Sequence, residues 1–176
     1  MNSLKDRNFN PDTIPGEFNV VALWTNFRAA RLRAGIMAGI FAGIMMQIFG
    51  MIFSAAKGMD ITTGFRIAAL PVLGNEAMAY GTSAGILVGL SIFFILTSFL
   101  GMAYAHFTGT NHLGNRFGIG LTWGAYGWIF ITCLFCPAFP HYYEAEIPRG
   151  PMFFAWMVFG LSLMSVAWFD KNAPKK

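Results

Sequence analysis

Few residues of this chain could do chemistry, and the most suggestive are two cysteines in the sequence Cys133-Leu-Phe-Cys136. A C-x-x-C pair can act as a redox dithiol or supply two ligands to a zinc or copper ion. His141 follows five residues after the second cysteine and could join such a metal site. Covalent haem attachment is excluded, because that motif needs a histidine directly after the second cysteine and Pro137 stands there.

Geometry separates the remaining interpretations of the cysteine pair. Helical residues three positions apart have Cβ atoms about 5–6 Å apart, whereas a disulfide needs about 3.5–4.5 Å. A disulfide therefore requires that Pro137 has unwound the end of the helix. Unpaired thiols packed in the core are the simplest expectation, since free cysteine packs as a small hydrophobic residue. A redox pair and a metal site formed by Cys133, Cys136 and His141 stay open as alternatives.

The three histidines bear on whether the protein could hold a haem or a pigment. His106 and His112 stand near one end of an apolar run, and His141 stands near the opposite end of the next one. A transmembrane path through two bis-histidine haems is excluded by this separation. His106 is a candidate lone ligand for a cofactor. The competing interpretation is a histidine at the headgroup boundary, bonded to backbone or lipid phosphate. The sequence requires no cofactor.

Motifs of soluble enzymes are missing from the sequence: it has no P-loop, no GxGxxG, no HExxH and no GxSxG. The apolar runs contain no Asp, Glu, Lys or Arg. Ion-coupled carriers and intramembrane proteases depend on such groups in mid-membrane. We therefore expect a protein that is not an enzyme and not a coupled carrier.

Four long apolar runs must position these residues. The chain is 56% hydrophobic and 11% charged, whereas a soluble domain carries about 25% charged residues. A helix of about 20 apolar residues crosses the hydrocarbon layer of a bilayer. We expect an all-α membrane protein whose four-helix bundle covers residues 34–170. The expected transmembrane helices are 34–56, 81–105, 117–136 and 152–169, with Pro137 ending the third and Pro151 near the start of the fourth.

The flanking segments set the orientation. Residues 1–33 form a polar N-terminal arm followed by a predicted interfacial amphipathic helix, and residues 171–176 form a basic tail. Most Lys and Arg residues lie in these two flanks, so the positive-inside rule puts both termini in the cytoplasm. The expected location is the inner membrane of a bacterium. The net charge of +4 then indicates contact with lipid headgroups and no nucleic-acid partner.

The first outer loop, residues 57–80, is long and too apolar for a plain solvated loop. Asp60 or Thr62 could cap a short helix that runs through Leu70 and ends at Pro71. Such a helix would lie flat on the bundle or dip into it.

Glycines recur every four residues in three of the expected transmembrane helices. They are Gly35, Gly39 and Gly43 in the first, Gly81, Gly85 and Gly89 in the second, and Gly120 and Gly124 in the third. Small residues at this spacing let helix backbones approach closely. Packing within the bundle is the simplest interpretation. A partner subunit docked on one of these faces is the alternative, because three such faces exceed what a bundle obviously needs.

Three stretches resemble a broad group of small bacterial four-helix membrane proteins with no assigned function. They are RAGIMAGIFAGIMM (residues 33–46), MDITTGFRIAALPVLG (59–74) and SFLGMAYAHF (98–107). The resemblance covers about residues 33–130. It implies a four-helix membrane fold and no functional residue.

The leading functional hypothesis is a non-catalytic accessory subunit of a larger membrane complex, of respiratory, oxidase or photosynthetic type. Its partners would be other membrane subunits, or further copies of the chain, and lipid. The second hypothesis is a homo-oligomeric passive channel or small-molecule transporter. The third is a redox or metal protein centred on the C-x-x-C pair.

Overall fold

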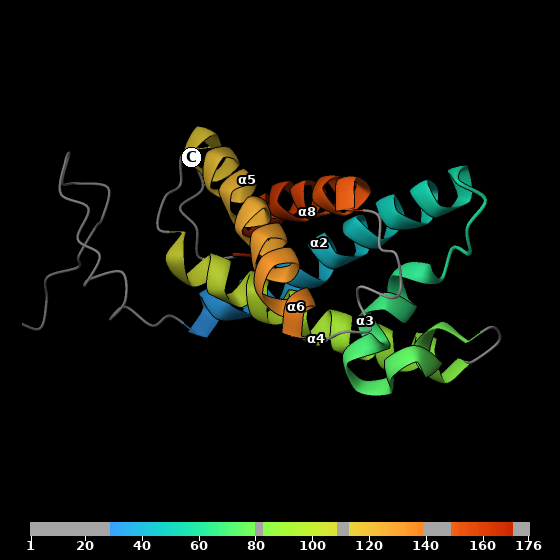
Figure 1. The fold of residues 1–176 in the computed structure, drawn as a ribbon. Helices are drawn as coiled ribbons and strands as arrows, with labels where there is room; N and C mark the ends of the chain where they lie inside the picture. The colour runs from blue at the N-terminus through green and yellow to red at the C-terminus, as the bar shows by residue number, and fades with distance from the viewer. Residues whose placement is uncertain (1–28, 80–82, 109–112, 139–148, 171–176) are drawn as a thin grey trace, which may run out of the picture.

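The computed structural model describes residues 29–79, 83–108, 113–138 and 149–170, and every element in them is helical. Figure 1 shows their arrangement. In chain order they are α2 (Ala29–Ala56), α3 (Thr63–Leu73), η3 (Gly74–Met78), α4 (Ser83–Phe107), α5 (Leu113–Ile129), η4 (Phe130–Phe135), α6 (Cys136–Ala138), α8 (Arg149–Ser162), η5 (Leu163–Ser165) and α9 (Val166–Phe169).

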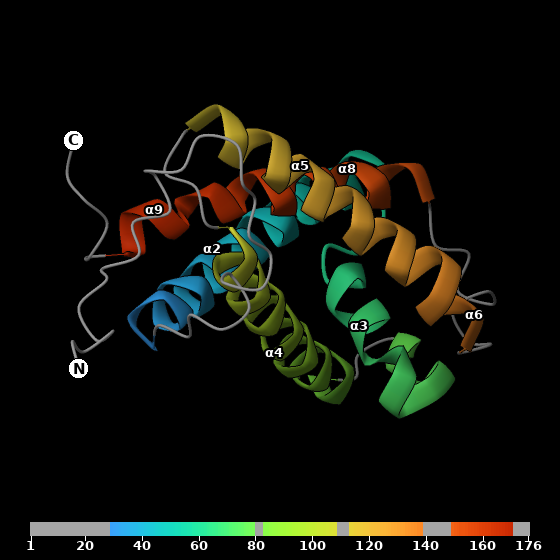
Figure 2. The same cartoon turned by 90° about the vertical axis from the view of Figure 1, so that its left-hand side faces the viewer.

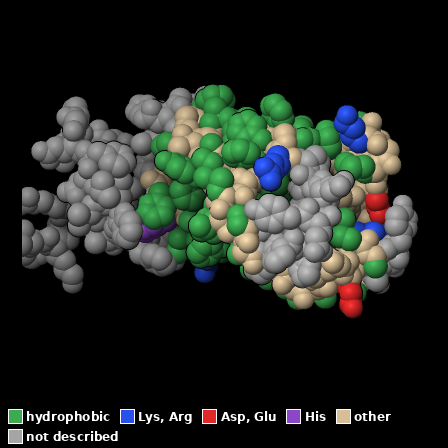
Figure 3. Space-filling view, in the orientation of Figure 1, with side chains coloured by type: hydrophobic (Ala, Val, Ile, Leu, Met, Phe, Trp, Pro, Cys, Tyr) green, Lys and Arg blue, Asp and Glu red, His purple; other side chains and the backbone are tan. Residues whose placement is uncertain are grey.

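Four helices in the described part of the chain are long and apolar enough to cross a membrane. They cover Arg31–Ala56, Ser83–Phe107, Arg116–Phe135 and Arg149–Phe169. Hydrophobic side chains cover much of the middle of the face in Figure 3, and the acidic side chains lie at the end that carries α3. The all-helical architecture expected from the four apolar runs is therefore present.

Two of these helices, α2 and α4, pack closely because glycine faces glycine at their crossing. A Cβ atom added to Gly35 would lie 2.6 Å from the carbonyl oxygen of Gly101, and one added to Gly101 would lie 2.5 Å from Cα of Gly39. Ala38 and Ala42 on the same face of α2 are fully buried. The packing of these small residues lets the backbones themselves touch.

The pair formed by α5 and α8 repeats this arrangement. A Cβ atom on Gly120 would lie 2.6 Å from the carbonyl oxygen of Gly160, and one on Gly160 would lie 2.8 Å from the backbone nitrogen of Gly124. The bundle thus consists of two glycine-packed pairs. Contacts between α2 and α8 join them around a core that includes Tyr104 and Phe159, both fully buried.

Helix α3 folds back against α4 and lies between it and the far end of α5 (Figure 2). The expected end at Pro71 is wrong, since the helix runs on to Leu73. Gly74 caps it with a φ of 56°, a left-handed conformation that glycine adopts without strain, and its N–H bonds to the carbonyl of Leu70.

The third long helix also differs from its expected end at Pro137, because helical structure continues through α6 to Ala138. A proline ring clashes with the carbonyl four residues earlier in a regular α-helix. That carbonyl belongs to Cys133, which lies in η4, a π-helical segment with a wider turn. The hydroxyl of Thr132 donates to the carbonyl of Trp128 at 2.7 Å and so supplies a partner where the α-helical pattern is interrupted.

The end of the bundle away from α3 is joined by two hydrogen bonds. The guanidinium of Arg31 donates to the carbonyl of Thr108, and the hydroxyl of Tyr104 donates to the carbonyl of Arg116 at 3.3 Å. Helix α2 begins at Ala29, five residues before the expected span, so Arg31 and Arg33 belong to the first long apolar helix. The rest of the predicted interfacial helix lies outside the described residues.

Candidate functional site: a cavity between the helix pairs

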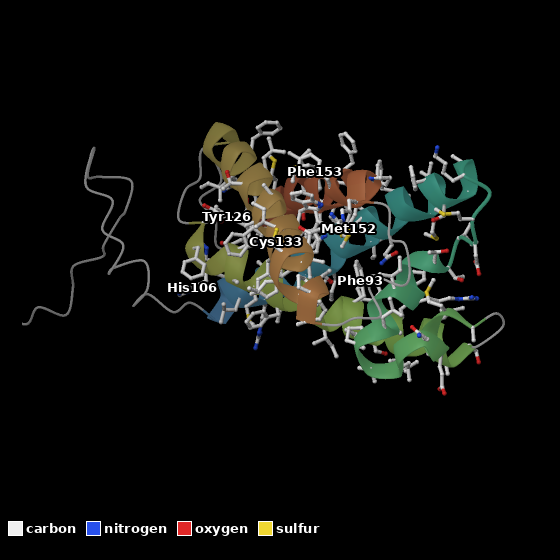
Figure 4. All side chains as sticks on the ribbon, in the orientation of Figure 1. Phe93, His106, Tyr126, Cys133, Met152 and Phe153 are labelled. Carbon is white, nitrogen blue, oxygen red and sulfur yellow. The ribbon has the colours of Figure 1, made fainter. Side chains whose placement is uncertain are left out.

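A partly open cavity of about 200 Å³ lies where α2, α3, α4, η4 and α8 meet. Its wall is mostly apolar and contains, among others, Phe93 from α4 and Met152 from α8, which are labelled in Figure 4. Each glycine-packed pair contributes part of the wall, and α3 contributes another part. The cavity occupies the half of the bundle next to α3, because its residues on α2 are 46–54 and those on α8 are 151–156.

Gln47 is the most polar side chain in the wall of the cavity. Only 8% of the residue is exposed, and its amide has no hydrogen-bond partner among the described residues. The amide oxygen lies against Gly64 of α3, where an added Cβ atom would come within 2.8 Å of it. Gly64 therefore leaves room for this amide. The amide has both donor and acceptor groups and faces the cavity, so it is available for a hydrogen bond to a molecule there.

Gly50 and Ser54 follow Gln47 along the same face of α2, at helical spacings of three and seven residues. A Cβ atom added to Gly50 would meet nothing within 4 Å, so the missing side chain adds to the cavity. The Ser54 residue is 6% exposed, and its hydroxyl has no partner within the described ranges. One stripe of α2 thus presents an amide, an open space and a hydroxyl in turn.

The hydroxyl groups of two threonines in the wall are already engaged. Thr97 donates to the carbonyl of Phe94 at 3.3 Å, and Thr63 donates to the carbonyl of Asp60 at 2.5 Å. Both bonds satisfy the hydroxyl locally within the chain. The wall contains no Asp, Glu, Lys or Arg among the described residues. The cavity therefore presents hydrogen-bonding capacity without charge.

Helix α3 is held in place by a polar cluster at its start. Asp60 accepts hydrogen bonds from the backbone N–H of Thr62 at 2.9 Å and from its hydroxyl at 2.8 Å. These bonds, with the nearby Arg66 guanidinium, lower the pKa of the Asp60 carboxyl below its ordinary value of 3.8. Asp60 and Arg66 also form a salt bridge of 3.0 Å, with the Arg66 side chain only 8% exposed. Thr62 occupies the N-cap position but makes no capping bond with its own side chain.

The cysteine pair is not assembled into a site by the described residues. Cys133 is exposed in η4 with a free thiol, so the expectation of a buried core thiol is wrong for this residue. Its sulfur lies 3.8 Å from the hydroxyl of Thr132. The side chain of Cys136 and all of His141 lie outside the described part of the chain, and no group of three metal-ligating side chains occurs within it.

His106 lies near the end of α4 that is remote from α3, and its ring packs edge-on against Phe107 at a centroid distance of 5.2 Å. It is half-buried and belongs to a different part of the bundle from both Cys133 and the cavity (Figure 4). His112, the other histidine near this end, lies outside the described residues. The candidate cofactor ligand therefore remains a prediction.

The glycines of the expected ladders contact other helices of the same chain wherever the structure describes them. Gly43 faces Thr97 and Phe93, Gly85 faces Ala77, and Gly89 faces Phe65. Gly81 lies outside the described residues. These glycine faces are thus used inside the bundle and do not by themselves indicate a partner subunit.

Sequence reasoning missed the glycines that complete these crossings, Gly101 and Gly160, and the open position at Gly50. Gly101 is separated from Gly89 in α4, and Gly160 from Gly150 in α8, by more than one four-residue step, so neither continues an unbroken four-residue repeat. In the sequence, Gln47 is the only strongly polar side chain of the first expected span, residues 34–56. Its position in a cavity depends on how five separate segments meet, which no local pattern shows.

Comparison with known proteins found no matching family model, no matching curated protein and no matching solved structure.

Proposed function

We propose that this protein is a non-catalytic membrane protein that binds a small uncharged molecule in the cavity between its two helix pairs. The observation that carries the proposal is the cavity itself, which is mostly apolar, uncharged among the described residues and bordered by the amide of Gln47, which has no partner in the described chain. Ligand sites between the helices of a bundle commonly combine an apolar wall with a few polar groups. The π-helical segment in the wall adds support, since such segments occur often at functional sites.

Gly50→Leu tests this proposal. The Cβ atom of a leucine there would meet no atom within 4 Å, and the rest of its side chain would extend into the cavity. We therefore expect the fold to persist and the ligand to be lost. Gly118→Leu is the matched control, because Gly118 is an exposed helical glycine with equally open space around its Cβ position.

The measurement is mass spectrometry of organic extracts from protein purified out of native membranes in mild detergent. A stoichiometric compound should accompany the wild type and the Gly118→Leu control and be missing from Gly50→Leu. Identical extracts from all three proteins would contradict the proposal.

The second proposal is the accessory subunit of a larger membrane complex, and Tyr126 is the observation that favours it. This tyrosine lies at the middle of the third span and is 64% exposed. Its hydroxyl has no partner in the described chain. A hydroxyl in the hydrocarbon layer has no water to bond to, so its burial against lipid alone is unfavourable. A neighbouring membrane helix with a hydrogen-bond acceptor would satisfy it.

A photo-cross-linking amino acid at position 126 tests the subunit proposal. Position 99 serves as the control, because Phe99 is 60% exposed on α4. We expect a defined adduct with another membrane protein from position 126 and only lipid adducts from position 99. Purification from native membranes in digitonin, with mass spectrometry and an absorption spectrum, would identify the partner and any haem or pigment. Lipid adducts alone from both positions would contradict this proposal.

The location and orientation are part of the same proposal. The inner membrane of a bacterium, with both termini in the cytoplasm, is supported by the four apolar helices and by the Lys and Arg residues of the two flanks. In this orientation α3 and the cavity lie in the outer half of the bilayer.

A further inference from the structure

We propose that the cavity binds a ring-sized, uncharged molecule with a hydroxyl or carbonyl group, and that the amide of Gln47 binds that group. The inference rests on the proposed binding function and adds the chemical class of the ligand and the residue that recognises it. Three features of the site lead to it: its size, its lack of charge and the position of the amide.

The size of the cavity limits the part of the ligand that it can enclose. An apolar cavity of about 150 Å³ is large enough to hold benzene, and this cavity measures about 200 Å³. One six-membered ring with a small substituent therefore fits. A longer apolar chain would have to extend out of the cavity through its open side. A free aromatic alcohol and the headgroup of an isoprenoid or other lipid share this chemistry.

The absence of charged groups in the described wall determines the charge of the ligand. Burying an ion without a partner of opposite charge costs several kcal/mol or more in a protein interior. No Asp, Glu, Lys or Arg of the described chain borders the cavity to offset that cost. A carboxylate, a phosphate or an ammonium group is therefore excluded from the enclosed part of the ligand.

The amide of Gln47 selects a polar substituent. It has both donor and acceptor groups, and it lies in a residue that is 92% buried, without a partner among the described residues. Gly64 leaves space for this amide on the α3 side, and Gly50 leaves space on the cavity side one helical turn further along α2. A hydroxyl or carbonyl next to the amide would satisfy it, while the ring would occupy the space over Gly50.

Phenol and toluene form a probe pair that separates recognition by Gln47 from binding in the cavity as such. They have nearly the same shape, and only phenol can form a hydrogen bond with the amide. Their affinities for the full-length protein in detergent can be measured by the rise in unfolding temperature with concentration. Gly50→Leu should abolish the rise in unfolding temperature with either compound, and Gly118→Leu should abolish neither rise. Comparison of these two variants separates binding in the cavity from nonspecific partition into micelles.

We expect phenol to bind the wild type about threefold to tenfold more tightly than toluene, the range that one hydrogen bond supports. Gln47→Leu should remove or reverse this preference, and Gln47→Asn should recover part of it if the shorter amide still reaches the ring. If phenol and toluene bind equally in the wild type, and Gly50→Leu abolishes both, the binding function stands and the role of Gln47 is overturned. If neither binds in a Gly50-dependent way, the proposed function itself fails, and water alone occupies the space beside the amide.

Discussion

Gly39 and Gly118 are both helical glycines, but their surroundings differ completely. A Cβ atom on Gly39 would collide with the backbone carbonyl of Thr97 on the facing helix, whereas one on Gly118 would meet nothing within 4 Å. A backbone carbonyl cannot move aside as a flexible side chain can. Stability therefore depends on the identity of the residue at one of these positions and not at the other.

We expect Gly39→Ala to lower the free energy of unfolding by about 1–3 kcal/mol, the usual cost of overpacking. Gly118→Ala should be neutral or stabilising by up to about 1 kcal/mol, because alanine favours the helix over glycine. Reversible unfolding in mixed detergent micelles of increasing SDS content measures both changes in the free energy of unfolding. Equal effects of the two substitutions would show that the close contact between α2 and α4 is not formed.

Asp60 gives α3 a dependence on pH. Its folded-state pKa is lowered, first by the backbone N–H of Thr62 and next by the Thr62 hydroxyl, with a smaller contribution from the charge of Arg66. A carboxyl whose pKa is depressed by folding stabilises the structure above its unfolded-state pKa. That stabilisation is lost as the pH falls through the folded-state value.

We therefore expect the hydrogen-exchange protection factors of the α3 backbone amides, corrected for the intrinsic pH dependence of exchange, to stay constant from pH 7 to about pH 5. Below about pH 4 these protection factors should fall. Asp60→Asn should reduce this loss of protection at low pH. Hydrogen exchange read by mass spectrometry on the segment Thr63–Leu73 is the measurement. An equal loss of protection at low pH in the wild type and the variant would assign the acid sensitivity to other groups.

At the scale of elements, α3 depends on a single glycine of its neighbour. Gly89 of α4 faces the backbone carbonyl of Phe65 so closely that any side chain there must push α3 away. The long helices α2 and α4 meet elsewhere, at Gly35 and Gly101. Detachment of α3 should therefore leave the crossing of the two long helices intact.

Gly89→Leu should raise hydrogen exchange in α3 at least tenfold and open one wall of the cavity, with little change in α2. Ser91→Leu is the control on the same helix, because Ser91 is exposed and its hydroxyl bonds only to the carbonyl of Leu87 in its own helix. Loss of protection throughout the bundle in Gly89→Leu would mean that α3 and the long helices unfold together.

The elements that could be predicted from the sequence were those defined by the composition of a long stretch of residues. Each of the four long helices appeared near its expected place because about 20 apolar residues without charge leave few alternatives. The ends were less predictable. Pro71 and Pro137 were expected to stop their helices, but Gly74 provides the end of α3, and the π turn accommodates Pro137. The cavity was not predictable, since it depends on the absence of a side chain at Gly50 and on segments far apart in the sequence.

For the whole molecule, the distribution of charge predicts how the bundle sits in a bilayer. A fluorescent protein fused after Lys176 should fluoresce, as expected for a cytoplasmic C-terminus, and an alkaline phosphatase fusion at the same place should be inactive. In a Cys133→Ala, Cys136→Ala background, Lys57→Cys should react with a membrane-impermeant maleimide from outside, because Lys57 is exposed just after α2. Labelling of Cys at position 57 only after the membrane is broken would indicate the opposite orientation.

The reciprocal contacts of Gly35 with Gly101 and of Gly120 with Gly160 also have a consequence for how this sequence can evolve. Every single-base change of a glycine codon that alters the residue introduces a side chain or a stop. Codons at these crossings should therefore be under strong purifying selection, whereas those for Gly50, Gly118 and Gly150, with nothing around their Cβ positions, are sterically free to drift. If Gly50 is nonetheless invariant in orthologous genes, selection is acting on the empty space beside it.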